Sequence, residues 1–176
     1  MPTLTTVQLP IPWETFGLPE RLQTGSTCLV DGTPGWAWSP AAPDLGILET
    51  ATSEGEQADG WDLDHVVVLV PAMGEALDTM ADALGAPRLL TEVGGRATAF
   101  FRVGPLLEVV ESPVRAPALY GLALVATEPL ETVVLNWRSR GLDVTDPRPA
   151  IQPGRRIFTV RGTAAGLAVM SPDGAH

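Results

Sequence analysis

Two ionisable side chains lie within runs of apolar residues, where polar groups are uncommon. His65 belongs to residues 63–70, LDHVVVLV, and Glu108 belongs to residues 106–111, LLEVVE. Both runs are short and rich in aliphatic residues, many of them β-branched, which favours strands. Because side chains alternate along a strand, each of the two shares its face with aliphatic neighbours. A carboxylate in such a place needs a partner or a neutral form, and the imidazole is either a satisfied core residue or part of a site.

Arginine is the cation available to this chain, because all eleven basic residues are arginine and none is lysine. Schiff-base chemistry through a lysine is therefore excluded, and a carboxylate or phosphate would have to be held by a guanidinium group. Four arginines are candidates for anchoring an anion, with a surface position as the alternative for most of them: Arg102, Arg155, Arg156 and Arg161.

Composition excludes several classes of site and partner. Cys28 is the single cysteine, and His65 and His176 are the two histidines, so neither a disulfide framework nor a cysteine-rich zinc site can form. The formal charge of −10 makes nucleic acid an unfavourable partner. We find no signal peptide and no apolar run long enough to span a membrane, and we therefore expect a cytoplasmic protein without a membrane partner.

The region around His65 and Glu108 has the order strand, helix, strand, strand, strand. After the strand that contains His65, Met73, Leu77, Met80 and Leu84 recur at helical spacing up to Gly85. This apolar stripe is most simply the core face of a helix. Three short strands are expected after it, separated by glycine and proline: 88–93, 97–103 and 106–111.

A second unit of the same order follows. Residues 120–126 predict a strand, and Pro129 to Gly141 predict a helix with Leu130, Val133, Val134 and Trp137 on one face. Three more strands are expected near 142–146, 155–161 and 166–170. The two units share little residue identity, so the repeat rests on their common pattern.

The first 60 residues are expected to form an extension that packs on the main domain of residues 61–173, whose modules span 63–112 and 118–173. Prolines at positions 2, 10, 12 and 19 argue against a helix or a central strand near the N-terminus. Residues 27–38, with Asp31-Gly32 as a turn signal, predict a hairpin, and residues 50–60 predict an acidic loop. Four of the five tryptophans lie within residues 13–61, and because such large rings gain most from burial, we expect the extension to dock on the main domain. A flexible lid or a dimer contact is the alternative.

The duplicated order resembles the vicinal oxygen chelate superfamily, which includes glyoxalases, methylmalonyl-CoA epimerases, extradiol dioxygenases and bleomycin-resistance proteins. The segments that carry the resemblance are LDHVVVLV at 63–70, LGAPRLL at 84–90 and FFRVGPLLEVVESP at 100–113. The resemblance implies an α+β fold of two tandem βαβββ modules, which form a curved mixed sheet around a cleft. It also implies a small-molecule ligand and a possible homodimer. His65 and Glu108 match the positions at which the first module of such proteins supplies metal ligands.

The second module departs from that pattern. Leu122 stands where the second histidine would be, and Ala168 stands where the second carboxylate would be. A divalent metal is therefore possible but half of its usual ligands are absent, and His65 with Glu108 alone would hold it weakly. Glu49 of the extension could complete such a site.

Other acids near these strands have a simpler interpretation. Asp62, Asp64 and Glu111 lie next to or at the ends of the two strands and are expected to be solvated charges rather than ligands.

Three functional hypotheses follow. The first is a lyase or isomerase that uses His65 and Glu108 as an acid/base pair or as partial metal ligands, with Arg102 available to bind an anionic substrate group. The second is a drug-sequestering protein without turnover, in which Leu122, Ala168 and Tyr120 line an apolar pocket. In the third, His65 and Glu108 are a hydrogen-bonded relic in a protein that mainly binds a partner.

Overall fold

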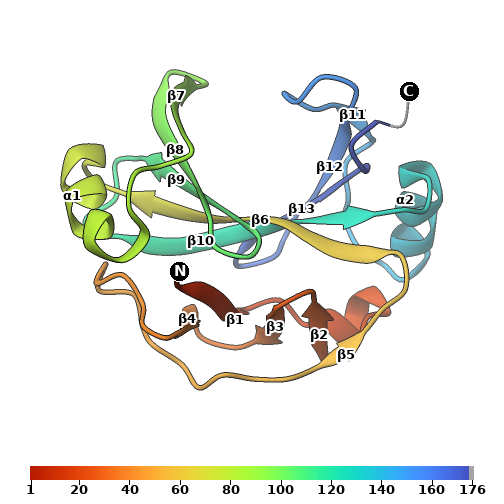
Figure 1. The fold of residues 1–176 in the computed structure, drawn as a ribbon. Helices are drawn as coiled ribbons and strands as arrows, with labels where there is room; N and C mark the ends of the chain where they lie inside the picture. The colour runs from red at the N-terminus through yellow and green to blue at the C-terminus, as the bar shows by residue number, and fades with distance from the viewer. Residues whose placement is uncertain (175–176) are drawn as a thin grey trace.

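A computed structural model describes residues 1–174, which form two β-sheets and two α-helices (Figure 1). The larger sheet contains both modules. The first module consists of β6 (Trp61–Val70), α1 (Met73–Leu84), β7 (Leu89–Val93), β8 (Arg96–Arg102) and β9 (Leu106–Glu111). The second consists of β10 (Ala118–Ala126), α2 (Leu130–Ser139), β11 (Arg148–Pro149), β12 (Arg156–Val160) and β13 (Gly166–Met170). The predicted α+β fold of two tandem βαβββ modules is confirmed.

The strand order of this sheet, β11-β12-β13-β10-β6-β9-β8-β7, joins the modules through their first strands. β6 and β10 pair antiparallel at the centre, and each first strand also pairs in parallel with the last strand of its own module. β7 with β8 and β11 with β12 rise at the two ends of the sheet (Figure 1). The strand expected near 142–146 is reduced to a single bridge between Val144 and Val160, and Pro147 and Pro149 limit pairing just after it.

The N-terminal residues form a second, five-stranded sheet, which we call the N-terminal sheet. Its order is β4-β1-β3-β2-β5, and its elements are β1 (Thr3–Leu9), the 3-10 turn η1 (Trp13–Phe16), β2 (Arg21–Thr24), β3 (Thr27–Asp31), β4 (Gly35–Ser39) and β5 (Glu56–Gln57). The predicted hairpin over 27–38 is wrong, because β1 lies between β3 and β4 and pairs with both. The expectation that no central strand runs near the N-terminus is also wrong, since Pro2 and Pro10 flank β1 without interrupting it.

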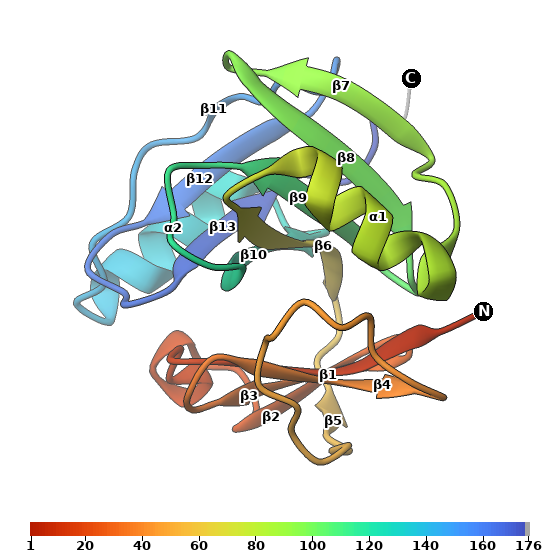
Figure 2. The same ribbon diagram turned by 90° about the vertical axis from the view of Figure 1, so that its left-hand side faces the viewer.

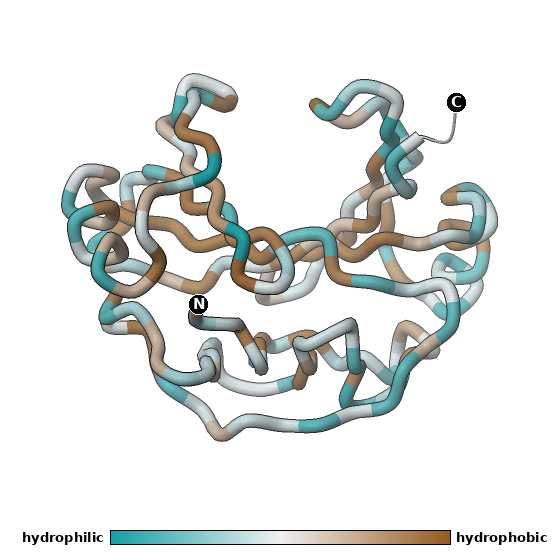
Figure 3. The backbone as a smooth tube through the Cα atoms, in the orientation of Figure 1, coloured by the Kyte–Doolittle hydropathy of each residue, from teal (hydrophilic) through white to brown (hydrophobic). Residues whose placement is uncertain are grey.

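The hydrophobic core lies between the two sheets. The N-terminal sheet covers the middle of the larger sheet, while α1 and α2 lie towards its two ends (Figures 1 and 2). The central strands carry mostly apolar residues along this layer (Figure 3). On the covered face, Val66 and Val68 of β6 and Leu122 and Leu124 of β10 are almost fully buried. The alternating side chains of β6 therefore face the core on one side and the cleft on the other.

Aromatic rings connect the N-terminal residues to the second module. Phe16 of η1 and Trp137 of α2 pack in a T-shaped arrangement with ring centroids 4.8 Å apart. Trp137 also stacks on Trp61 of β6, with ring centroids 5.5 Å apart. The Leu4 amide also donates a hydrogen bond of 2.8 Å to the Val103 carbonyl of the first module. The first residues are thus held against both modules. Among the described residues, neither helix has the length and apolarity that crossing a bilayer requires.

Candidate functional site

A β-bulge in β6 brings two consecutive side chains to the cleft face of the sheet. His65 pairs with Ala123 of β10 and Leu63 pairs with Leu124, so Asp64 is an extra residue in β6. Such a bulge interrupts the alternation of side chains and lets neighbours point the same way. Asp64 is only 13% exposed, and the expectation that it is a solvated strand-end charge is wrong.

His65 lies between two carboxylates. Its Nδ1 is 2.7 Å from Oδ2 of Asp64, and its Nε2 is 3.2 Å from Oε2 of Glu108 on the neighbouring parallel strand β9. The His65 and Glu108 side chains are 15% and 18% exposed. Since an ionised Asp64 can only accept, Nδ1 must carry a proton and donate it. Nε2, on the other side of the ring, lies within ion-pair distance of the Glu108 carboxyl group.

Arg155 holds Asp64 from the other side. Its Nη2 lies 2.7 Å from Oδ1 of Asp64, and its Nε donates a hydrogen bond of 3.0 Å to the Ser171 carbonyl. Its side chain is only 7% exposed, although an exposed Asp173 oxygen lies 3.4 Å from Nε. The four side chains thus form a continuous chain of contacts in the order Arg155, Asp64, His65, Glu108. Sequence reasoning named Arg155 as a possible anion anchor or surface residue and missed this internal partner.

The surroundings of Asp64 set its protonation. Burial alone would raise the pKa of Asp64, but the hydrogen bonds from His65 and Arg155, together with their charges, outweigh burial and hold the pKa below its usual range. Asp64 therefore remains a carboxylate in the folded protein under conditions that protonate ordinary aspartates. It can orient His65 through Nδ1 at neutral and mildly acidic pH.

The lowered pKa of Asp64 predicts a pH-dependent contribution to stability. A carboxyl group whose pKa is lower when folded stabilises the protein above its unfolded pKa of about 3.9, and this contribution is lost as the pH falls through the folded pKa. We expect Asp64→Asn to destabilise the protein most at neutral pH and progressively less in acid, as measured by urea unfolding from pH 7 downwards. Asp62→Asn, two residues away and exposed, is the matched control. A destabilisation that does not change with pH would contradict this assignment.

A cavity of about 350 Å³ opens on the cleft face beside His65. The second module supplies most of its wall, which includes Ala123, Thr159, Leu167 and Ala168. Ala123, Ala168 and Thr159 lie in register with His65 across β10, β13 and β12. Glu108 lies on the opposite side of His65, on β9. A molecule in the cavity would therefore meet the imidazole at one wall and an apolar surface at the other.

The other residues named from the sequence occupy different places. Tyr120 lines the cavity and is 53% exposed, and its ring lies so close to Gly166 that a Cβ there would be 2.6 Å from Cε1. Leu122 also borders the cavity, but it is 3% exposed and pairs with Val66 in the core, so Ala123 is the residue of β10 opposite His65. Arg102 borders a separate cavity of about 230 Å³ together with Asp62.

The remaining acids and arginines lie away from the cleft pair. Glu49 bridges to Trp36 in the N-terminal sheet, and Glu111 accepts a hydrogen bond from the Met73 amide at the start of α1. Arg156 contacts Glu131, and Arg161 lies 3.8 Å from Asp143, both at exposed positions. None of these four groups contacts the pair of His65 and Glu108 in the structure.

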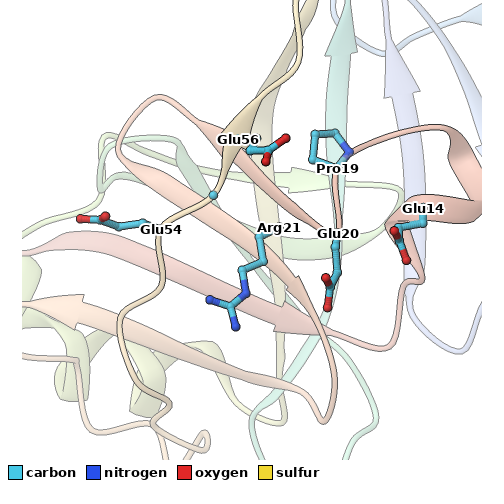
Figure 4. Close-up of a pocket in the computed structure, with 7 residues that line it drawn as sticks. Glu14, Pro19, Glu20, Arg21, Glu54 and Glu56 are labelled. Atoms are coloured by element: carbon cyan, nitrogen blue, oxygen red, sulfur yellow. The ribbon is translucent and has the colours of Figure 1, made fainter.

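A larger hollow lies elsewhere, on the N-terminal sheet. It has a volume of about 550 Å³ and is bordered by Arg21 and by the acids Glu14, Glu20, Glu54 and Glu56. Figure 4 shows that these side chains spread apart instead of converging on one point. The hollow contains neither His65 nor Glu108, so we place the candidate site in the smaller cleft.

The described residues do not fit a three-ligand metal site. Both nitrogens of His65 face carboxylates, and the positions in line with His65 across β10 and β13 are Ala123 and Ala168. Within residues 1–174, no group of three or more histidine, cysteine, aspartate or glutamate side chains has the arrangement of a metal site. Catalytic metal sites generally need about three protein ligands. The site is better suited to moving protons than to holding a divalent ion.

Metal addition is accordingly expected to have little effect. We predict that Zn²⁺, Ni²⁺, Fe²⁺, Mn²⁺ or Mg²⁺ will shift the thermal midpoint of the protein by less than about 1 °C, since tight binding to the folded state would raise it. Elemental analysis of protein purified without an affinity tag or chelator provides the second measurement. Stoichiometric metal that disappears in His65→Ala would contradict this prediction.

Comparison with known proteins yields matches among solved structures. No protein-family model matches the sequence, and no curated protein does. Methylmalonyl-CoA epimerase from Mycobacterium tuberculosis superposes with a TM-score of 0.53 and 18% identity, over 64% of this chain and 88% of that one. Hypothetical protein BH1468 from Bacillus halodurans C-125 gives 0.56 and 14%, over 67% and 99%. A Streptomyces coelicolor methylmalonyl-CoA epimerase variant with 2-nitronate-propionyl-CoA gives 0.51 and 12%, over 64% and 97%. These matches confirm the vicinal oxygen chelate fold.

Proposed function

We propose that this chain, which has the vicinal oxygen chelate fold, is an acid/base enzyme of the isomerase or lyase type. It would move a proton on a small molecule that carries a carbonyl group. The observation that supports this proposal most is the 3.2 Å contact between Nε2 of His65 and Oε2 of Glu108, in a cleft beside a cavity. Two titratable groups at this distance can transfer a proton in opposite directions during one reaction.

The proposed step uses Glu108 as the base and His65 as the acid. Because Glu108 does not border the cavity, the substrate would lie across His65, with its reacting carbonyl end between Nε2 and Glu108 and its other end in the cavity. The Glu108 carboxylate removes a proton from the carbon next to the carbonyl, and the electron pair of that C–H bond becomes the new C=C bond. The carbonyl oxygen takes a proton from Nε2 of the His65 imidazolium, so an enol forms while Glu108 becomes neutral and His65 becomes an uncharged imidazole. Return of the proton to a different atom completes an isomerisation, and loss of a neighbouring leaving group completes a lyase reaction.

Asp64 and Arg155 are positioning residues in this mechanism. Asp64 accepts the Nδ1 proton of His65, which leaves Nε2 as the nitrogen that exchanges protons with Glu108 or a substrate. Arg155 fixes Asp64 through its second oxygen. A fixed hydrogen-bond acceptor behind the imidazole also stabilises the imidazolium form that acts as the acid.

The structural neighbours are compatible with this proposal, but they are not evidence for the reaction. Methylmalonyl-CoA epimerase is by its name an enzyme that changes configuration at a carbon atom, and several of the matched structures are of that enzyme. At 12–18% identity the likeness concerns the fold, and members of one fold differ widely in chemistry. The reaction class is therefore inferred from His65, Glu108 and the contacts that hold them.

Exchange of carbon-bound hydrogen tests the proposed function. The protein is incubated in D₂O with small uncharged ketones and aldehydes, beginning with 2-indanone, and loss of the α-proton signal is followed by ¹H NMR. We expect at least one compound to exchange faster with the protein than in buffer alone, and this acceleration to disappear in Glu108→Gln. Absence of acceleration across the panel would reject an enolising enzyme.

Ligand sequestration without turnover is the second candidate. It is favoured by the apolar wall formed by Ala123, Leu167 and Ala168 opposite the imidazole. A sequestering protein would release its ligand chemically unchanged, which mass spectrometry of a denatured complex detects. It would also leave the α-proton of a bound ketone unexchanged, so the D₂O experiment separates the two functions.

A further inference from the structure

We infer that the cleft selects a small carbonyl compound that bears no negative charge and turns its apolar part towards the second module. This inference rests on the proposed function for the carbonyl group and deepens it by defining the charge and orientation of the substrate.

The fixed charges at the site leave no surplus cation. Asp64 and Glu108 are both acidic, and the guanidinium group of Arg155 contacts Asp64 and the Ser171 carbonyl. With a neutral imidazole the four side chains carry a net charge of −1, and with an imidazolium they carry none. A carboxylate or phosphate placed here would lose hydration without gaining a free positive partner, which is costly in a partly buried cleft.

The wall of the cavity does not supply that partner. Among the described residues that border the cavity, none is an arginine. Arg156 contacts Glu131, Arg138 contacts Asp146, and Arg102 borders the separate cavity that contains Asp62. The formal charge of −10 adds a negative field around the whole molecule, which further disfavours anions and favours cations.

The opposite wall determines how a substrate would lie. Ala123, Leu167 and Ala168 form an apolar surface, and the half-exposed ring of Tyr120 stands beside them over Gly166. The cavity of about 350 Å³ is near the lower end of the range of about 300–1,000 Å³ seen for small-molecule sites. A compact ligand would bury its aliphatic or aromatic part against this wall and present its carbonyl group to His65.

This charge preference separates the chain from the epimerases that share its fold. One of those structures is described as a complex with methylmalonyl-CoA, an ester whose phosphates and carboxylate are anionic. Within residues 1–174, no arginine borders the cavity, and the guanidinium group of Arg155 is held by Asp64. We therefore expect methylmalonyl-CoA to be among the compounds that do not bind.

Binding of three ketones with one skeleton and different charge tests the inference. The probes are acetophenone, 4-acetylbenzoate and (4-acetylphenyl)trimethylammonium, and the readout is the ring signals of isotopically labelled histidine, which are simple to assign because the chain has two histidines. We expect the neutral and cationic probes to shift the His65 signals with an affinity at least about tenfold above that of the anion. Equal or tighter binding of 4-acetylbenzoate, or no shift with any of the three, would overturn the inference.

An added arginine provides the reverse test. Ala168→Arg places a cation on the cavity wall and should raise the affinity for 4-acetylbenzoate at least about tenfold, whereas Thr132→Arg on the exposed side of α2 adds the same charge elsewhere. An equal gain in both variants would mean that net charge, and not the cleft, sets the preference. Because the experiment measures binding, charge selectivity without proton exchange would reject the proposed enzyme while leaving this inference intact.

Discussion

Replacement of Glu108 by glutamine is expected to lower protein-catalysed exchange of the α-proton by about 10²–10⁴-fold, the usual contribution of a positioned acid or base. Glutamine has nearly the same size and can still contact Nε2 of His65, so the fold should be retained. It cannot take a proton from carbon. His65→Ala is expected to cause a loss of the same order, because the carbonyl oxygen then lacks its proton donor.

The control for this pair is Glu92→Gln, which removes an exposed acid from β7 of the same module. It should leave the exchange rate unchanged. Circular dichroism and urea unfolding establish whether each variant is folded before its rate is compared. Exchange at the wild-type rate in both Glu108→Gln and His65→Ala would remove the pair from the mechanism. A double variant no slower than either single variant would support a pair that acts as one unit.

Local patterns were sufficient to predict the modules. The apolar runs at 63–70 and 106–111 and the helical stripe from Met73 to Leu84 each follow from residue spacing within one element. Their order then limited the fold to few alternatives, because a strand and the next parallel strand must be joined by a crossover. His65 and Glu108 could be singled out because a polar group in an apolar strand stands out against its own neighbours.

The partners of His65 could not be predicted in the same way. Regular alternation of side chains predicts that Asp64 and His65 lie on opposite faces of β6. In the structure a bulge brings both to the same face, and this bulge arises from pairing with β10, which is distant in the sequence. Arg155 reaches Asp64 from the residue just before β12, and nothing in the local sequence distinguishes it from the exposed Arg156 beside it. The positions of Asp64 and Arg155 in the site therefore depend on contacts between strands that are far apart in the sequence.

The N-terminal sheet was mispredicted for a related reason. The Asp31-Gly32 turn signal is local and was interpreted as joining two paired strands. In the structure β1 lies between those two strands and pairs with both. The partners of β3 and β4 are therefore decided by residues 3–9, which lie outside the turn and the two strands that it connects. Proline is likewise unfavourable inside a hydrogen-bonded strand, but a strand can form between two prolines, as β1 does.

Removal of residues 1–60 is expected to prevent stable folding of the two modules. The N-terminal sheet covers Val66, Val68, Leu122 and Leu124, each of which is at most 3% exposed. Exposing a fully buried aliphatic side chain costs about 1.5–3 kcal/mol, so these four alone would cost about 6–12 kcal/mol. Typical domains are stable by about 5–15 kcal/mol in total. A protein of residues 61–176 should therefore lack a cooperative thermal transition and should bind a hydrophobic dye.

Single substitutions in the full chain test the same interface without removing it. Leu4→Ala, at a fully buried position of β1, should destabilise the protein by about 2–5 kcal/mol in urea unfolding. Thr5→Ala, at the next residue of β1, should have a much smaller effect because Thr5 is partly exposed. Cooperative unfolding of residues 61–176 at nearly the full-length stability, together with equal effects of the two substitutions, would mean that the modules bury their central strands without the N-terminal sheet. The N-terminal sheet would then be an attachment and not a part of the core.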